Sequence, residues 1–304
     1  MTVYLSSLSK GSRRTANQSL RVITEVSGRG DDILNYPWHE LRYQHVQAIR
    51  TYLADKYSVA TANKILAILK GVLKECKRLG LMSIEDYDKA VDIKAVSGNT
   101  ITKGKYITPE QFKAILDSCD NTLIGKRNRA IFHCLQLGLR RSEVASLNVK
   151  DFNYNEGSIL VTKAKRNKSR LVFLTDAGIK AIKDYLEERR KKKDGRSNDN
   201  NDSTTSAFFP LSSATSLENW LFSSGRNQRI TDQTIYNIIK SCAATLDINI
   251  AAHDFRRTCA SNLLSKGVDI VTVKNILGHE SIETTANYDR RGIDAQKQAS
   301  KLLD

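Results

Sequence analysis

Residues 157–174 read GSILVTKAKRNKSRLVFL, and this segment decides the fold. Two short runs rich in β-branched and aliphatic residues, 159–162 and 171–174, flank a basic turn, which is the pattern of a β-hairpin. On both sides of the segment, apolar residues recur at helical spacing instead. The sequence therefore predicts a mostly α-helical chain with a small antiparallel β-hairpin or sheet in its C-terminal part.

The N-terminal third of the chain reads as a helical unit. Residues 12–95 contain three long segments with helical periodicity and a shorter fourth. The third of these segments opens with a Thr61 cap and ends on Gly80, a reasonable start and stop for a helix.

A linker and a second domain follow. Residues 96–106 (VSGNTITKGKY) are polar, contain glycine and lack periodicity. A new helix then begins, with Thr108 as its N-cap, Pro109 at its first position and Glu110 in its first turn. We predict two domains and a linker, with the boundaries 1–96, 97–107 and 108–304. Within the second domain, residues 191–226 read as a long polar, flexible loop to which the sequence assigns no role.

The charge of the chain points to a polyanionic partner. Forty-eight Lys and Arg stand against 33 Asp and Glu, which leaves a formal net charge of +15. Neutralising phosphates releases condensed counterions, so a nucleic acid is the partner this charge favours. A basic protein without such a partner, or one bound to an acidic membrane surface, remains an alternative at this point.

Several other classes of protein do not fit the sequence. No stretch approaches 18 consecutive apolar residues, and the N-terminus shows no secretory signal, so we expect a cytoplasmic protein without a membrane partner. The five cysteines show no CxxC pair, which indicates reduced thiols. No cluster of Cys and His has zinc-ligand spacing, so we expect no metal site.

Four segments of the second domain carry residues suited to chemistry. They are GLRRSE (138–143), KAKRNKSR (163–170), HDFRR (253–257) and LGHESIETTANYD (277–289). Taken singly, each residue has an ordinary structural explanation, such as a capping arginine, a structural histidine or a partly buried tyrosine. The order and spacing of the four segments together give them their value.

Together these residues suit phosphoryl transfer without a metal ion. Two guanidinium groups, Arg140 and Arg256, would clamp the non-bridging oxygens of a phosphodiester. Tyr288 would supply the nucleophile, and a lysine of the hairpin turn would protonate the departing sugar oxygen. His253 and His279 would hydrogen-bond the phosphate or accept the tyrosine proton.

The same four segments resemble the tyrosine recombinase (phage integrase) family, and its Xer-type members in particular. The motifs cover nearly all of residues 108–295, and the N-terminal helical unit is similar to the SAM-like core-binding domain of that family. The resemblance implies a two-domain, C-shaped clamp on DNA, in which residues 1–96 bind DNA and residues 108–304 form the catalytic domain.

The resemblance also implies a role for each residue. Arg140 and Arg256 would hold the scissile phosphate, His253 would assist proton transfer, His279 would donate a hydrogen bond to the phosphate, and Tyr288 would attack it. Glu143 would support the site from behind. Lys165 would be the general acid, since counting back from Arg170 selects it, although counting forward from Gly157 falls on Lys163.

The family reaction forms a 3′-phosphotyrosyl link and exchanges strands through a Holliday junction, with four protomers on two duplexes and no cofactor. We therefore expect double-stranded DNA with a specific recombination site as the partner, in a homotetramer, with accessory DNA-bending proteins as a further class of partner. The location implied is the prokaryotic nucleoid. Residues 294–303 (DAQKQASKLL) resemble the family's C-terminal segment, which docks on a neighbouring protomer. The predicted DNA-binding residues are Lys64, Lys70, Lys74, Lys103, Lys105, Lys163, Arg166, Lys168 and Arg257.

Three other functions stay open on the sequence. A type IB topoisomerase-like enzyme would use the same chemistry as a monomer, to relax DNA rather than exchange strands. A non-catalytic DNA-binding regulator would keep the fold without the activity, which the complete residue set disfavours. A helical scaffold protein with an incidental basic surface is the remotest of the three. The sequence does not specify the recombination site, or whether integration, excision, resolution or inversion is the reaction performed.

Overall fold

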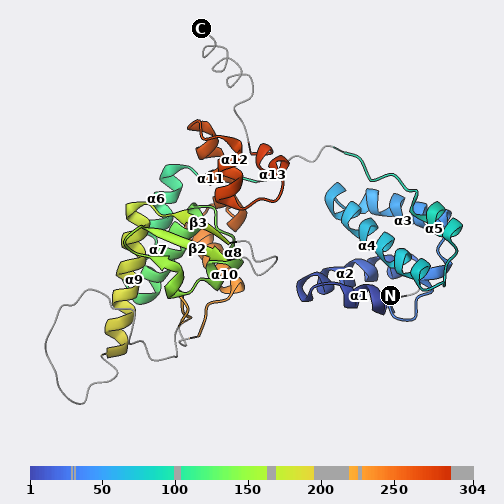
Figure 1. The fold of residues 1–304 in the computed structure, drawn as a ribbon, viewed down its shortest axis with the longest axis horizontal. Helices are drawn as coiled ribbons and strands as arrows, with labels where there is room; N and C mark the ends of the chain where they lie inside the picture. The colour runs from blue at the N-terminus through green and yellow to red at the C-terminus, as the bar shows by residue number, and fades with distance from the viewer. Residues whose placement is uncertain are drawn as a thin grey trace, which may run out of the picture. The chain divides into compact units, whose positions relative to one another are not determined.

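A computed structural model of the chain describes residues 1–28, 30, 32–98, 104–162, 169–194, 219–224 and 228–288, without the side chains of Lys10, Lys193 and Asp194. The chain forms two compact units, unit 1 (residues 1–102) and unit 2 (residues 103–304). Figure 1 shows the helices and strands of both units. Each unit encloses a core of its own, as the separate clusters of buried side chains show.

The regular elements of unit 1 are all helices in its described residues. Its elements are α1 (Thr2–Ser7), α2 (Lys10–Val26), the 3₁₀ turn η1 (Trp38–Glu40), α3 (Tyr43–Lys56), α4 (Val59–Arg78) and α5 (Ile84–Val91). The long helix α4 supplies seven of the buried core side chains, from Ala62 to Cys76, because its apolar residues recur at helical spacing. Its N-cap is Ser58, whose side chain accepts a hydrogen bond from the backbone of Thr61. The predicted cap at Thr61 was therefore wrong by one turn.

The chain leaves unit 1 along α4. The side chain of Asn63 makes two hydrogen bonds with the backbone of Val96. Its Nδ2 donates to the Val96 carbonyl at 2.9 Å, and its Oδ1 accepts from the Val96 N–H at 2.8 Å. The ammonium of Lys70 donates to the carbonyl of Ile93 at 2.9 Å. These bonds satisfy backbone groups that no helix or strand would pair.

Unit 2 surrounds a small sheet with helices. Its elements are α6 (Pro109–Asp117), α7 (Leu123–Gln136), α8 (Arg141–Ser146), η2 (Val149–Asp151), β1 (Phe152–Asn153), β2 (Ser158–Thr162), β3 (Ser169–Phe173), α9 (Asp176–Asp194), α10 (Asp232–Thr245), α11 (Ala252–Ser265), α12 (Ile270–Leu277) and α13 (Ile282–Ala286). The strands are antiparallel in the order β1-β2-β3, and the β2–β3 pair runs from Ser158 opposite Phe173 to Thr162 opposite Ser169. The prediction of a mostly α-helical fold with a small antiparallel sheet is confirmed, with β1 as an addition.

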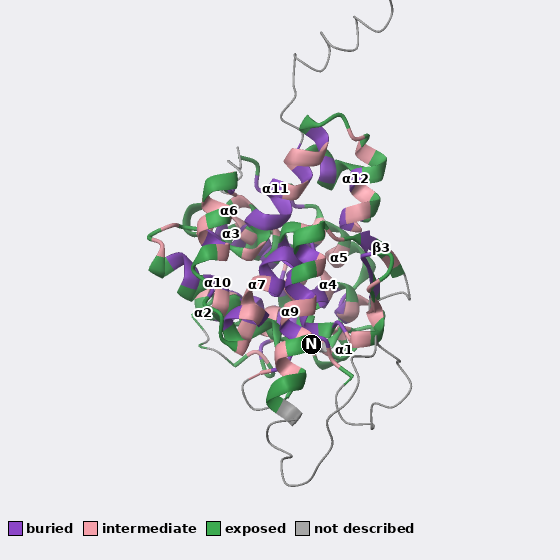
Figure 2. Ribbon diagram, turned by 90° about the vertical axis from the view of Figure 1, so that its left-hand side faces the viewer, coloured by how far each residue is buried: buried purple, intermediate pink, exposed green. Residues whose placement is uncertain are grey.

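Two helices at the centre of unit 2 are the most thoroughly buried. Figure 2 shows α7 and α11 mainly in the colour of buried residues. In α7 the run from Ala130 to Leu135 is buried without interruption, and α11 buries charged residues beside its apolar ones. The first helix, α6, begins as predicted, with Thr108 as N-cap in a capping box with Gln111 and with Pro109 at the first helical position.

Some predictions fall on residues that the structure does not describe. Lys103, Lys163, Lys165, Arg166 and Lys168 lie outside the described residues, as do most of the 191–226 segment and all of residues 294–303. In the part of the chain that is described, no helix is both long enough and apolar enough to cross a membrane. The same residues contain no cluster of His, Cys, Asp and Glu suited to a metal ion.

Candidate active site

Six of the predicted site residues are described: five predicted catalytic residues and Glu143, which is predicted to support them. All six lie in unit 2, on elements far apart in the sequence. Arg140 is the N-cap of α8 and Glu143 lies in its first turn, while His253 and Arg256 lie one turn apart on α11. His279 follows α12, and Tyr288 follows α13. Hydrogen bonds and ring contacts join them into one cluster, to which the structure adds Arg170 from β3.

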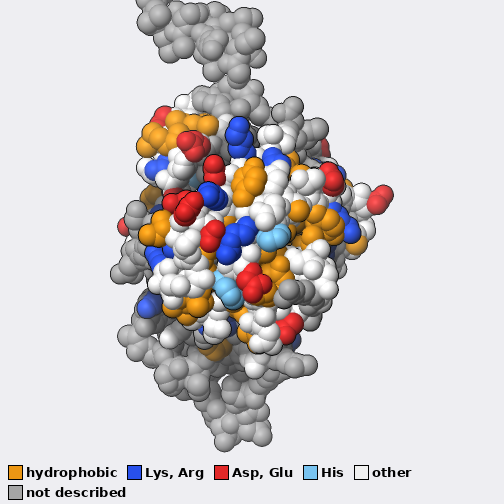
Figure 3. Space-filling view, turned by 90° about the vertical axis from the view of Figure 1, so that its right-hand side faces the viewer, with side chains coloured by type: hydrophobic (Ala, Val, Ile, Leu, Met, Phe, Trp, Pro, Cys, Tyr) orange, Lys and Arg blue, Asp and Glu red, His pale blue; other side chains and the backbone are white. Residues whose placement is uncertain are grey.

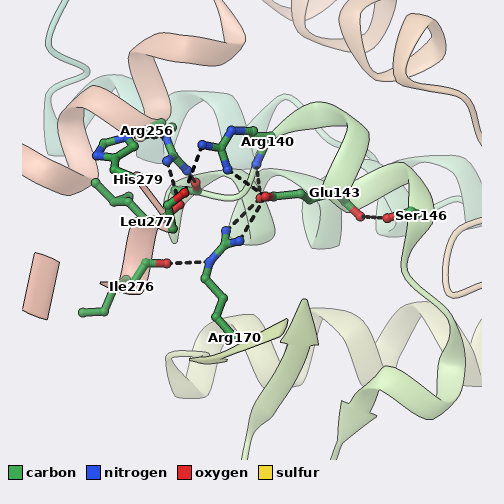
Figure 4. Close-up of polar contacts among 10 residues, drawn as sticks. Arg140, Glu143, Ser146, Arg170, Arg256, Ile276, Leu277 and His279 are labelled. Atoms are coloured by element: carbon green, nitrogen blue, oxygen red, sulfur yellow. Dashed lines mark hydrogen bonds and ion pairs between the residues drawn. The ribbon is translucent and has the colours of Figure 1, made fainter. Parts of the chain in front are cut away.

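Glu143 is the centre of the polar contacts (Figure 4). Its buried carboxylate accepts from the backbone N–H of Arg140 at 2.9 Å and from Nη1 of Arg140 at 2.8 Å. Its two oxygens also accept from Nη1 and Nη2 of Arg170, at 3.0 and 2.8 Å. Burial alone would raise the pKa of Glu143, but the hydrogen bonds from Arg170 and Arg140 outweigh it and lower the pKa to about 2. Glu143 is therefore a fixed anion that holds two guanidinium groups in place.

The C-terminus of α12 is held by three arginines. A helix leaves its last carbonyls without intrahelical partners and carries a partial negative charge there. Here the carbonyl of Ile276 accepts a hydrogen bond from Arg170 at 2.8 Å. The carbonyl of Leu277 accepts from Arg256 at 2.6 Å, and that of Gly278 accepts from Arg140 at 3.3 Å. Gly278 makes this possible because it takes the left-handed conformation, φ 65°, that ends the helix.

Arg256 is the more deeply buried of the two predicted phosphate-binding arginines. The residue is 1% exposed, whereas the side chain of Arg140 is 39% exposed. Nη1 of Arg256 donates to the carbonyl of Gly138 at 2.6 Å, in addition to the bond that Nη2 gives to Leu277. Burial and the neighbouring Arg140 lower the pKa of Arg256 to about 10, so the group stays protonated at neutral pH.

His279 is neutral in this arrangement, and its hydrogen bonds define its tautomer. Nε of Arg256 carries a proton and donates to Nε2 of His279 at 3.2 Å, so Nε2 is the acceptor. Nδ1 therefore carries the hydrogen and donates to Oγ1 of Thr285 at 2.8 Å. Burial and the charge of Arg256 lower the pKa of His279 to about 4, which agrees with the neutral form.

Tyr288 contacts both histidines. Its hydroxyl lies 3.0 Å from Nε2 of His253, and its ring stacks on that of His279 with centroids 5.8 Å apart. Tyr288 is 6% exposed. Partial burial of the His253 ring and the charges of Arg256 and Arg257 lower the pKa of His253, which favours the neutral imidazole that can accept a proton.

The predicted DNA-binding residues divide into two groups where they are described. Lys64, Lys74 and Lys105 are exposed. The ammonium of Lys70 is engaged by the carbonyl of Ile93, and Arg257 is buried. The face of the molecule in Figure 3 mixes Lys and Arg with Asp, Glu and apolar side chains, so the excess positive charge is not concentrated on that face.

Sequence reasoning missed one member of this site. Arg170 served only as a reference point for counting along the hairpin, yet it binds both Glu143 and the end of α12. The signal available was its place at the end of the basic segment 163–170, beside the start of an apolar strand.

Comparisons with known proteins give the relatives of this chain. The model of the phage integrase family matches residues 105–292. Tyrosine recombinase XerA of Pyrococcus furiosus is 25% identical over 247 residues, which cover 78% of this chain and 72% of the relative. Tyrosine recombinase XerC of Thermodesulfovibrio yellowstonii is 30% identical over 189 residues, which cover 60% of this chain and 57% of the relative.

Among solved structures, the Tn1549 transposon integrase in complex with transposon right end DNA superposes with a TM-score of 0.72. It is 15% identical in sequence, and the match covers 98% of this chain and 95% of that one, so this likeness concerns the fold. The family model matches well over half of the chain, across every described residue of the site: the chain belongs to the phage integrase family, the tyrosine recombinases.

Proposed function

We propose that this recombinase cleaves and rejoins DNA at a specific site through a 3′-phosphotyrosyl bond to Tyr288, and exchanges strands through a Holliday junction. The observation that carries the proposal is the 3.0 Å contact between the Tyr288 hydroxyl and Nε2 of His253, beside a cluster of guanidinium groups. A nucleophile within hydrogen-bond reach of a base that is itself held in place is the arrangement covalent catalysis needs.

The proposed proton transfers begin from the neutral imidazole of His253. His253 accepts the phenolic proton as the oxygen of Tyr288 bonds to phosphorus. The bond from phosphorus to the 5′ oxygen breaks, and Lys165 protonates the departing oxygen. The 5′-hydroxyl of a partner strand then attacks the phosphotyrosyl bond in the reverse sense, which regenerates the tyrosine without an external energy source.

Arg140 and Arg256 hold the scissile phosphate in this proposal. Arg140 is exposed on one side, and Glu143 and the end of α12 fix its orientation, so it can meet a phosphate without rearranging. Arg256 lies behind it, and its three hydrogen bonds use three of its five N–H groups. Because Arg256 is buried, direct contact with the phosphate requires a small opening of the cluster.

His279 orients Arg256 in the described arrangement, since its Nε2 accepts from that arginine. The predicted hydrogen bond from His279 to the phosphate requires the other tautomer, with the hydrogen on Nε2. Exchange of that hydrogen would accompany the same opening that frees Arg256.

DNA is the proposed partner of both units. The excess of 15 positive charges supports this. We propose that Lys64, Lys74 and Lys105 contact phosphates, together with Lys103 and the hairpin residues Lys163, Arg166 and Lys168. The reaction then takes place in a homotetramer on two sites and performs integration, excision or resolution, with accessory DNA-bending proteins as further partners. The nucleoid remains the expected location.

The experiment that tests the proposal is recombination between two sites taken from the DNA that flanks the gene. Two plasmids, each with one site, are incubated with the protein, and joint molecules and recombinants are resolved on gels. The proposal predicts Holliday junctions followed by recombinants, both absent with Tyr288→Phe. Relaxation of single plasmids by a monomer without joint molecules would favour the topoisomerase-like function, and specific binding without cleavage would favour the regulator.

A further inference from the structure

The segment that enters unit 2 is fixed along one side of α11, the helix that carries His253 and Arg256. The backbone N–H of Lys105 donates to Asp254 at 2.9 Å, and that of Ile107 donates to Oγ1 of Thr258 at 2.9 Å. The hydroxyl of Tyr106 donates to Oδ1 of Asn262 at 2.7 Å. Residues 254, 258 and 262 are four apart, so they form one stripe on the helix.

Gly104, at the start of this segment, touches Arg257 of the same helix. Its carbonyl accepts from Nη1 of Arg257 at 3.0 Å. A Cβ at Gly104 would overlap Nε of Arg257 and lie 2.5 Å from its Cζ, so a larger residue at position 104 would force the guanidinium to shift. The position of Arg257 is therefore set by the backbone of the entering segment.

Arg257 also contacts the proposed nucleophile. Its Cζ lies 5.5 Å from the centre of the Tyr288 ring, within the range of a cation–π interaction. Arg257 is 8% exposed, and its Nε has no hydrogen-bond partner among the described residues. A buried donor without a partner costs free energy, and Nε of Arg257 is such a donor. The contacts that hold the guanidinium are the carbonyl of Gly104 and the ring of Tyr288.

We propose that Arg257 is a positioning residue that couples the segment 104–107 to Tyr288, so that a shift of this segment moves the nucleophile relative to His253. This inference rests on the proposed role of Tyr288. It replaces the prediction that Arg257 contacts DNA, because the side chain is buried and its guanidinium contacts Gly104 and the Tyr288 ring.

The test is a double-mutant cycle on the rate of covalent adduct formation. Wild type, Gly104→Ala, Arg257→Ala and the double variant are compared on a nicked suicide duplex at saturating protein, with site affinity and melting temperature measured in parallel. Tyr106→Phe is the matched control, because it changes the same segment and contacts the same helix without touching Arg257.

We expect Gly104→Ala to slow adduct formation by about 10-fold or more when Arg257 is present, since small misplacements of reacting groups are costly. In the Arg257→Ala background the same change should matter by less than about 2-fold, because the clash is gone. Site affinity should stay unchanged, and Tyr106→Phe should react like wild type.

Other results would overturn the inference. Equal slowing in both backgrounds, no slowing at all, or a loss of affinity instead of rate would each remove the coupling. Should Gly104→Ala unfold unit 2, Arg257→Lys supplies the test, because it keeps the charge but not the planar fork; a wild-type rate would contradict the coupling. Absence of any adduct with wild type would instead refute the proposed function.

Discussion

Replacing Glu143 by glutamine should destabilise unit 2 strongly, because Glu143→Gln keeps the shape of the side chain and removes its charge. The carboxylate receives hydrogen bonds from Arg140 and from both terminal nitrogens of Arg170. An amide cannot accept all four bonds, and its NH₂ group would face a guanidinium. Two arginines would then lie side by side without their common counter-charge.

The pKa of Glu143 gives the magnitude. The structure lowers it from 4.5 to about 2, which at roughly 1.4 kcal/mol per unit corresponds to about 3 kcal/mol. Because the folded pKa is depressed, this stability is fully present above pH 4.5 and is lost as the pH falls toward 2. We expect Glu143→Gln to lower the free energy of unfolding by about 3 kcal/mol at pH 7.

The assay is urea denaturation in a Trp38→Phe background, in which the fluorescence of Trp220 monitors unfolding. The chain has two tryptophans, one in each unit, so the remaining one reports on unit 2. Glu188→Gln is the matched control: its carboxylate pairs with Lys126 in the same unit but is 33% exposed, so little change is expected.

The pH dependence separates this explanation from a packing defect. Between pH 7 and 3.5 the wild type should lose about 1.4 kcal/mol of unfolding free energy relative to Glu143→Gln, since only the wild type takes up a proton at this position. A difference between the two proteins that is below about 1 kcal/mol at pH 7, or that stays constant down to pH 3.5, would refute the role of Glu143 as a buried anion.

Three further predictions concern the proton donor, the neutral histidine and the DNA contacts. Lys165→Ala should slow cleavage of an ordinary phosphodiester by about 100-fold or more, and a bridging 5′-phosphorothiolate should restore most of the rate; equal defects on both substrates would place the general acid elsewhere on the hairpin. His279 has a folded pKa of about 4, below its ordinary 6.5, so its contribution to stability is complete above pH 6.5 and is lost as the pH falls toward 4. Between pH 7 and 5 the wild type should therefore lose about 2 kcal/mol more than His279→Gln in urea melts, and equal losses would contradict the neutral assignment. Lys64→Ala and Lys74→Ala should each reduce the slope of log binding constant against log salt by about 0.9, whereas Lys70→Ala should leave the slope unchanged because its ammonium is held by Ile93.

The sequence predicted the parts of the site that local spacing determines. His253 and Arg256 are three residues apart, so any helix places them on neighbouring positions of one face. The alternation in residues 157–174 gave the antiparallel pairing of β2 and β3, and the capping residues gave the start of α6. In each case the deciding information lies within one segment of at most 18 residues.

Contacts between distant segments could not be predicted in this way. Arg170 acts on Glu143 and on α12 because β3 turns this side chain toward them, and the sequence does not give that packing. Lys64, Lys70 and Lys74 look alike on α4, yet the ammonium of Lys70 is bonded to the chain leaving unit 1, whereas Lys64 and Lys74 are exposed. The side chain of Arg257 is buried for the same reason, beneath Gly104.

A local ambiguity caused the error at the start of α4. Ser58 and Thr61 are three residues apart, and both are good N-cap residues. In the structure Ser58 is the N-cap, and its side-chain oxygen accepts a hydrogen bond from the backbone N–H of Thr61. The earlier start adds a turn that includes Val59, whose side chain packs against the core of unit 1, and this contact favours it.

The most direct test of the account is to identify the residue and the DNA end joined in the covalent adduct. The protein is incubated with a nicked suicide duplex in the presence of EDTA, the adduct is digested with protease and nuclease, and the modified peptide is sequenced by mass spectrometry. The account predicts a 3′-linked nucleotide on Tyr288, and no adduct with Tyr288→Phe. A nucleotide on another residue, a 5′ linkage, or strand cleavage without any adduct would contradict it.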